Sequence, residues 1–367
     1  MFKKIASFSL ALFLFISCAS EQPEYDPIDV PNAEITLISE IRDSDDIMFG
    51  NITNIEITSN HHILAGDFTR NRIHIFDEHG DFVHSAIKDG RGPGEVQRFM
   101  DFRVNSENQL MVYDVPLKRF VVFNFTGSDL EYKNEFLADY FIRIFHLASD
   151  GSVFLNVPTS PATQDEERID RVLRLNQQGE LINDELLTFP PSEQFTISNH
   201  GGMSIMTVSS PHHATNVIDF WDNRLFYSRS TETGFTVFDL DTGDQIQQVS
   251  LRRPDIPLPQ EERREFIQNM ILASGVEGLS ASRYMAEMPE IKGKVSAIHY
   301  DPKGYIWLQT IGDEKRTWLI FSEDGQLRAR LDHDFDGNIM SIRYGRFAVL
   351  ERDEFDVPMI QVYEYEL

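Results

Sequence analysis

The stretch RIHIFDEHG, residues 72–80, decides the fold, because similar stretches return four more times along the chain. In each one, a run with alternating apolar residues is followed by a polar turn that ends in glycine. The other copies are RFVVFNFTG (119–127), RVLRLNQQG (171–179), FTVFDLDTG (235–243) and TWLIFSEDG (317–325). Their turn glycines lie 47, 52, 64 and 82 residues apart. Recurrence at such intervals is typical of a repeat fold with insertions between the later units.

Each copy belongs to a longer unit of four strand-like runs. In the first unit these runs are residues 55–58, 63–66, 73–76 and 82–87. Short apolar runs separated by polar turns predict a four-stranded antiparallel meander. Because the spacing approaches the ~40–50 residues of a propeller blade, we predict an all-β, six-bladed β-propeller over residues 33–367.

The sixth unit, residues 339–365, has room for only three strands before the sequence ends. Residues 34–41, EITLISEI, form an additional alternating run before the first unit. If this N-terminal run pairs with residues 359–365, it supplies the missing strand and closes the ring.

A segment of about residues 258–290, between the fourth and fifth units, departs from the strand pattern. Glu261 and Glu262 begin a predicted helix at its favourable acidic end, and Gly275 ends it. Its apolar stripe consists of Phe266, Ile267, Met270 and Ile271. A second short helix is predicted over 282–288. The insertion is either a cap packed on the propeller or a lid or partner-docking element, and the excursion at 188–215 is expected on the same rim.

The N-terminal residues predict where in the cell the protein is located. Residues 1–17 have a positive start and an apolar run too short to span a bilayer, as in a secretory signal peptide. Residues 14–18, LFISC, resemble the bacterial lipobox, which implies lipidation at Cys18, the only cysteine of the chain. Residues 18–32 then predict a flexible tether rich in proline and acids. No disulfide within the chain is possible, so stability must come from packing.

The charge of the chain excludes one class of partner. Lys+Arg number 33 and Asp+Glu 59, a net charge of −26, which becomes −28 when Lys3 and Lys4 leave with the signal peptide. Such a surface repels polyphosphate, so nucleic acid is not expected as a partner. A hydrophobic content of 41% is sufficient for a packed core.

The stretch KDGRGPGE, residues 88–95, matches the Gly-x-Gly-Pro-Gly-Glu loop of a known family. The chain resembles the six-bladed β-propeller lipoproteins of Bacteroidetes-type bacteria, relatives of NHL-repeat propellers, and the resemblance covers residues 33–367. It implies a lipid-anchored protein of the cell envelope, on the outer membrane, with either a periplasmic or a surface orientation. It implies no particular activity.

The same loop is the first candidate for a ligand site. It joins an outer strand to the next inner strand, which places it at one mouth of the central channel. Its glycines would let backbone amides form an anion nest beside an arginine, whereas the alternative is a structural crossing between blades. The predicted ligand-binding rim consists of Arg91, Gly92, Gly94, Arg98, Arg143 and His212.

The sequence contains no catalytic signature: no HExxH spacing and no Gly-x-Ser-x-Gly occur. The leading interpretation is a monomeric, non-enzymatic module without a cofactor that binds a protein, a small molecule or a glycan. The alternative is a metal-dependent hydrolase or lyase, lactonase-like or glycan-directed, with a divalent cation in the channel. The recurring pairs Asp67–Arg72 and Asp114–Arg119 are expected to fasten turns, and Trp221, Trp307 and Trp318 to fill the core.

Overall fold

The computed structural model describes residues 24–25, 30–159, 168–198, 204–312, 316–332, 335 and 337–367. These residues form six blades, each of four antiparallel strands, that follow one another around a propeller. The predicted all-β, six-bladed propeller is confirmed. In every blade the first strand is innermost, and the inner strands of successive blades lie against one another around the ring.

The first three blades follow the chain without interruption. Blade 1 consists of β3 (Ile52–Ile57), β4 (Ile63–Asp67), β5 (Arg72–Phe76) and β6 (Phe82–Ala86). Blade 2 consists of β7 (Phe99–Val104), β8 (Gln109–Asp114), β9 (Arg119–Phe125) and β10 (Leu130–Leu137). Blade 3 consists of β11 (Ile144–Leu147), β12 (Val153–Pro158), β13 (Asp170–Leu175) and β14 (Leu181–Phe189).

Of the other three blades, only the last includes a strand from the N-terminal end of the chain. Blade 4 consists of β17 (Asn216–Trp221), β18 (Arg224–Arg229), β19 (Gly234–Asp239) and β20 (Gln245–Leu251). Blade 5 consists of β21 (Val295–Asp301), β22 (Tyr305–Ile311), β23 (Arg316–Ser322) and β24 (Leu327–Leu331). Blade 6 consists of β25 (Asn338–Arg343), β26 (Arg346–Arg352), β27 (Pro358–Glu366) and β2 (Glu34–Ile41).

The N-terminal strand closes the ring as predicted. β2 pairs antiparallel with β27, from Glu34 opposite Glu366 to Ile41 opposite Ile360. The chain just before it is also attached, because β1 (Glu24–Tyr25) pairs parallel with β20 and the Ala33 amide donates to the Arg330 carbonyl at 2.7 Å. The described part of the predicted tether therefore runs along the outer strands of blades 4 and 5. The predicted signal peptide and Cys18 lie outside the described residues.

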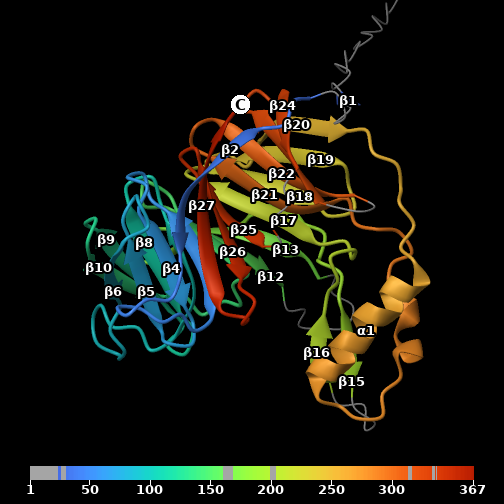
Figure 1. Ribbon diagram of the computed structural model, residues 1–367, viewed down its shortest axis with the longest axis horizontal. Helices are drawn as coiled ribbons and strands as arrows, with labels where there is room; N and C mark the ends of the chain where they lie inside the picture. The colour runs from blue at the N-terminus through green and yellow to red at the C-terminus, as the bar shows by residue number, and fades with distance from the viewer. Residues whose placement is uncertain are drawn as a thin grey trace, which may run out of the picture.

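A side domain projects from the ring (Figure 1). It combines the hairpin of β15 (Phe195–Ser198) and β16 (Ser204–Val208) with α1 (Gln260–Ser274) around a small apolar core that includes Ile267 and Tyr284. Gly275 ends α1 with a φ of 67°, as predicted. The helix expected over 282–288 is instead two 3₁₀ turns, Ala281–Arg283 and Met285–Glu287, because so short a segment does not sustain an α-helix.

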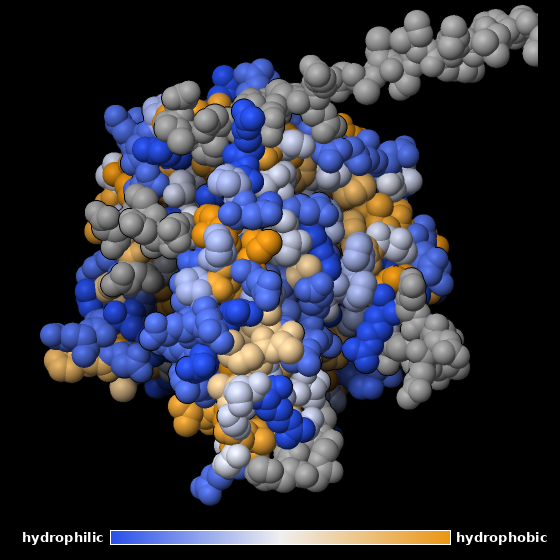
Figure 2. Space-filling model, turned by 90° about the vertical axis from the view of Figure 1, so that its right-hand side faces the viewer, coloured by the Kyte–Doolittle hydropathy of each residue, from blue (hydrophilic) through white to orange (hydrophobic). Residues whose placement is uncertain are grey.

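The side of the molecule shown in Figure 2 is mostly polar, and its apolar residues form small separate patches. Isolated apolar side chains are ordinary on a protein surface. Among the described residues visible there, no broad apolar area marks a membrane contact or a large protein interface.

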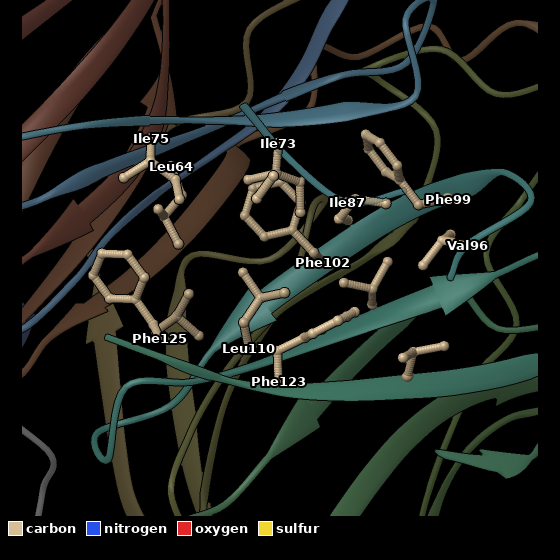
Figure 3. Close-up of a cluster of buried hydrophobic side chains, with 14 residues drawn as sticks. Leu64, Ile73, Ile75, Ile87, Val96, Phe99, Phe102, Leu110, Phe123 and Phe125 are labelled. Atoms are coloured by element: carbon tan, nitrogen blue, oxygen red, sulfur yellow. The ribbon is translucent and has the colours of Figure 1, made fainter. Parts of the chain in front are cut away.

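The cores lie between neighbouring blades. Between blades 1 and 2, Leu64, Ile73 and Ile75 of β4 and β5 face aromatic and aliphatic side chains of β7–β9, including Phe102 and Phe123 (Figure 3). Each fully buried side chain of this size contributes about 1.5–3 kcal/mol. Because each inner strand is held on both sides by such packing, the residues that it turns toward the channel are fixed in position.

Candidate functional site

One position of each inner strand carries a polar side chain between two apolar neighbours. The six residues, which we call the polar ring, are Glu56, Arg103, His146, Asp219, His299 and Arg343. Neighbouring residues of a strand point to opposite sides. Flanking residues such as Ile55 and Phe102 are fully buried between blades, and the polar ring therefore faces the channel.

Blades 1 and 2 are joined at the polar ring by a carboxylate–guanidinium network. Arg103 Nη1 lies 3.0 Å from Glu56 Oε1, and its Nη2 lies 3.0 Å from Asp101 Oδ2. The side-chain Nδ2 of Asn54 donates to the Asp101 carboxylate at 2.5 Å and to the Phe102 carbonyl at 2.6 Å. About a quarter of the Arg103 side chain stays accessible, and this part lines a pocket in the channel that is described below.

A second network joins blades 4, 5 and 6. The two terminal nitrogens of Arg343 each lie 3.3 Å from a different carboxylate oxygen of Asp219. Arg343 also donates to the Tyr300 carbonyl at 2.6 Å, while the Tyr300 amide donates to Asp219 at 2.9 Å. The guanidinium stacks 5.1 Å from the ring of Trp221. Both partners of the ion pair are largely buried, so each needs the other.

Burial and neighbouring charges set the protonation of the polar ring. Burial lowers the pKa of His146 and of His299 to about 4, so both imidazoles are neutral at neutral pH. Burial also raises the pKa of Glu56, against the effect of Arg103. For Asp219, burial would raise the pKa, but Arg343, His299 and the Tyr300 amide outweigh it and lower the pKa.

Several buried polar atoms around the channel have no hydrogen-bond partner among the described residues. They are His146 Nε2, Ser341 Oγ, Arg343 Nε and Tyr344 OH. Since buried polar groups are nearly always hydrogen-bonded, these atoms indicate bound water or a ligand. Tyr344 has a φ of 56° and Gly345 a φ of 80°, the backbone conformation of the two-residue turn that joins β25 to β26.

The channel widens into a pocket of about 340 Å³ at the end where the inner strands begin. Asn54, Asp101 and five residues of the polar ring, all except His146, supply its polar wall. Its apolar wall is supplied mainly by Ile144, Ile218, Ile298, Met100 and Met340. We call this the channel pocket. Its size and its mixture of apolar surface with a few fixed polar groups are typical of a small-molecule site.

Comparisons with known proteins agree with this architecture. Residues 40–215 match the DUF5128 family model, described as a 6-bladed beta-propeller. A Bacteroides fragilis protein described as exported is 10% identical over 91% of this chain and 96% of its own, with a TM-score of 0.56. A DUF4221 family member from Bacteroides vulgatus is 10% identical over 91% of this chain and 98% of its own, also with a TM-score of 0.56. No curated protein matches the chain.

The chain is a six-bladed β-propeller, similar in fold to these Bacteroides proteins. The resemblance carried by residues 88–95 is thereby confirmed for the family and its fold. At 10% identity, the structural neighbours show the shared fold and nothing about the ligand.

Of the predicted rim residues, the structure brings one to the channel pocket of this propeller. Arg143, just before β11, lines the pocket and donates to Asp170 at 2.9 Å and to Ser192 at 2.7 Å. Arg98 stacks instead on Phe68, 4.7 Å from the ring centre. His212 accepts a hydrogen bond from the Gly293 amide at 3.2 Å, away from the residues that line the pocket.

The Gly92 amide of the glycine loop is already hydrogen-bonded within the loop. The Gly92 amide, which an anion nest would offer to a ligand, donates to the Glu95 carboxylate at 2.9 Å. Arg119 also donates to the Glu95 carbonyl, at 2.6 Å. Gly94 has a φ of 73° and lies against Tyr132, whereas Arg91 is exposed. These contacts favour a structural crossing between blades 1 and 2, and ligand binding by Arg91, Gly92 and Gly94 stays a prediction.

The recurring aspartates also hold this side of the ring together. The predicted pair Asp114–Arg119 is present, at 3.3 Å. The predicted pair Asp67–Arg72 is wrong: Asp67 accepts hydrogen bonds from the Gly50 and Arg70 amides, and Arg72 lies 3.1 Å from Asp89. Asp67 is turned inward, toward the chain that enters β3, while Arg72 reaches outward. The three tryptophans are buried, as expected.

The described residues contain no group of three or more His, Cys, Asp or Glu placed to hold a metal ion. Both ring nitrogens of His213, the neighbour of His212, are hydrogen-bonded: Nδ1 lies 2.7 Å from the Ser210 hydroxyl and Nε2 lies 2.9 Å from the Glu287 carbonyl. In the same part of the chain, no helix has the length and apolarity needed to cross a membrane.

Proposed function

We propose that this protein is a cell-envelope lipoprotein whose propeller binds a small polar ligand in the channel pocket without transforming it. The observation that carries the proposal is the polar ring, from which five of the six blades direct a fixed polar side chain into the channel pocket. Since the charged groups are already held in pairs, they need no reordering when a ligand arrives, which lowers the entropic cost of binding.

The chemistry of the polar ring favours binding over catalysis. Its carboxylates are hydrogen-bonded to arginines or backbone amides, which leaves no free base beside a free acid. The low pKa of His146 and His299 makes both weak bases at neutral pH. The alternative, a metal-dependent hydrolase or lyase, would need a cation site, and the described residues offer no ligand set for one.

The location is part of the proposal. The signal-like residues 1–17 and the cysteine at 18 favour lipidation, and the similar Bacteroides fragilis protein is described as exported. Radiolabelled palmitate should label the chain in cells, and Cys18→Ser should abolish the label and move the protein to the soluble fraction. Labelling that survives Cys18→Ser would overturn the lipid anchor.

Thermal unfolding with defined ligands tests the binding function. The mature chain carrying Cys18→Ser is screened with neutral sugars, amino acids, dicarboxylates and divalent cations. We expect one class to raise the melting temperature, and Met100→Trp, which fills the pocket mouth, to abolish the rise. The matched control is Met48→Trp: Met48 is 63% and Met100 59% exposed, but Met48 does not line the channel pocket. The proposal fails if no class stabilises the chain or if Met100→Trp leaves the stabilisation unchanged.

A further inference from the structure

A second pocket adjoins the channel pocket. It lies between blade 3 and the start of the side-domain hairpin and has a volume of about 440 Å³. Its lining includes Phe141, Asp170, Ser192 and Thr207. Arg143 lines both pockets, so the two are neighbouring compartments of one extended site. We call the second one the rim pocket.

A buried carboxylate oxygen in the rim pocket lacks a partner. Asp170 is only 1% exposed. Its Oδ2 accepts hydrogen bonds from Arg143 at 2.9 Å, Asn216 at 2.8 Å and Ser192 at 3.3 Å. Its Oδ1 accepts none within the described part of the chain. A buried acceptor without a donor indicates that a bound molecule supplies one.

The two pockets together are electrically balanced. Their lining contains four arginines, Arg103, Arg143, Arg168 and Arg343, and four carboxylates, Glu56, Asp101, Asp170 and Asp219. The chain as a whole carries −26, so this balance is a local property of the site. An anion or a cation would leave one sign uncompensated, whereas a neutral ligand would leave the ion pairs intact.

A hydroxyl group suits such a lining, because it donates one hydrogen bond and accepts others. It can bond to a carboxylate and to a guanidinium at once without separating them. A sugar also has an apolar C–H face, which binds best against an apolar surface. At the rim, Phe141 is 77% exposed and can stack on this face. In the channel pocket, Ile144, Ile218 and Ile298 offer a similar apolar wall.

We propose that the channel pocket and the rim pocket are adjoining subsites for a short neutral oligosaccharide. One sugar lies on the polar ring, the next stacks on Phe141, and Arg143 contacts both. This inference rests on the proposed binding function and adds the class of ligand to it.

Calorimetric titration of the mature chain tests the inference. The neutral probes are glucose, galactose, N-acetylglucosamine, maltose, cellobiose, lactose and diacetylchitobiose, with glucuronate and glucosamine as charged comparators. We expect at least one disaccharide to bind tenfold or more tightly than its monosaccharide, and the charged sugars to bind more weakly than their neutral counterparts. Met100→Trp should abolish binding of the disaccharide.

Two aromatic variants isolate the rim pocket. Phe141→Ala should weaken disaccharide binding about fivefold, the effect of losing one aromatic stacking contact, and should narrow the difference between disaccharide and monosaccharide. Phe355→Ala is the matched control, since Phe355 is also 77% exposed and lines neither the rim pocket nor the channel pocket. It should leave binding unchanged.

The possible failures are distinguishable. If trialanine, glucuronate or another non-sugar or charged probe binds in a Met100→Trp-sensitive way and neutral sugars do not, the oligosaccharide inference is wrong and the binding function stands. If disaccharides bind but Phe141→Ala has no effect, the rim subsite is wrong. If no probe binds at the channel pocket, the proposed function itself fails.

Discussion

The ion pair between Asp219 and Arg343 allows a quantitative test of how the channel is built. Asp219→Asn keeps the size of the side chain but removes the charge that faces the guanidinium. Arg343 is then left with 7% of its side chain exposed and no carboxylate bonded to it, with Glu56 as the remaining acidic neighbour. Removing one partner of a buried ion pair costs about 3–5 kcal/mol. Because Arg343 keeps its hydrogen bond to the Tyr300 carbonyl, we expect the lower end, about 3 kcal/mol.

The double variant Asp219→Asn/Arg343→Gln separates the charge from the packing. With both charges removed, nothing charged stays buried, so the double variant should recover most of the loss and lie within about 1 kcal/mol of the parent chain. Asp356→Asn is the control for a surface pair. Its partner Arg352 lies 3.4 Å away, and Asp356 is 84% exposed, so no measurable change is expected.

Urea unfolding followed by tryptophan fluorescence measures these differences. Trp221 lies beside Arg343 and is buried, so its emission reports on the channel. A loss of about 3 kcal/mol corresponds to a melting temperature lower by roughly 5–10 °C in a domain of this size. The reasoning is refuted if Asp219→Asn is as stable as the parent chain, or if the double variant is no more stable than Asp219→Asn alone.

Three further outcomes are expected. Deleting residues 33–42 removes β2 from blade 6, so the melting temperature measured by circular dichroism should fall by more than about 10 °C; an unchanged melting temperature would contradict ring closure. The lowered pKa of His146 and of His299 means that the unfolded chain binds more protons than the folded chain between about pH 6.5 and pH 4. Urea unfolding should therefore show full stability above pH 7 and a loss of up to about 3 kcal/mol per histidine as the pH falls through this window. Glu56 partly offsets this loss, because its raised pKa acts in the opposite direction. A flat profile would show that the imidazoles are not buried. Tyr344→Phe removes a hydroxyl that has no partner among the described residues and for which bound water is inferred, so the free energy of unfolding should fall by about 0.5–1.5 kcal/mol; an unchanged or higher value would show that nothing bonds to this hydroxyl.

The fold could be predicted from the sequence because its signals are local and repeated. Alternating apolar residues before a turn glycine occur at residues 72–80 and again in each later copy, and each copy is one strand and its turn in the structure. Closure by residues 34–41 followed from the missing strand of the last unit. The helix from Gln260 to Ser274 followed from its acidic start and its terminal glycine. None of these inferences needed a long-range contact.

The site could not be found in the same way, because no two residues of the polar ring are close in the sequence. Each inner strand supplies one residue of the polar ring, and Glu56 and Arg103, which form an ion pair, are 47 residues apart. Aligning the first strand of every unit would have revealed the signal, a polar residue between two apolar ones as in Ile55-Glu56-Ile57. A search for short motifs instead favoured the glycine loop, whose Gly92 amide is already bonded to Glu95.

The electrostatics of the whole chain narrow the class of ligand independently of any contact. The net charge of −26 repels anions before they reach the pocket and attracts cations to the entire surface. Inside, every carboxylate that lines the two pockets is already bonded to an arginine, a backbone amide or another polar side chain, so a cation that enters must compete with an existing partner. An anion meets the same difficulty at Arg103, Arg143 and Arg343, which are already paired with carboxylates. A neutral, hydroxyl-rich molecule avoids both conflicts, because it can bond to the unpartnered Asp170 Oδ1 and to the free polar atoms of the channel without breaking an ion pair.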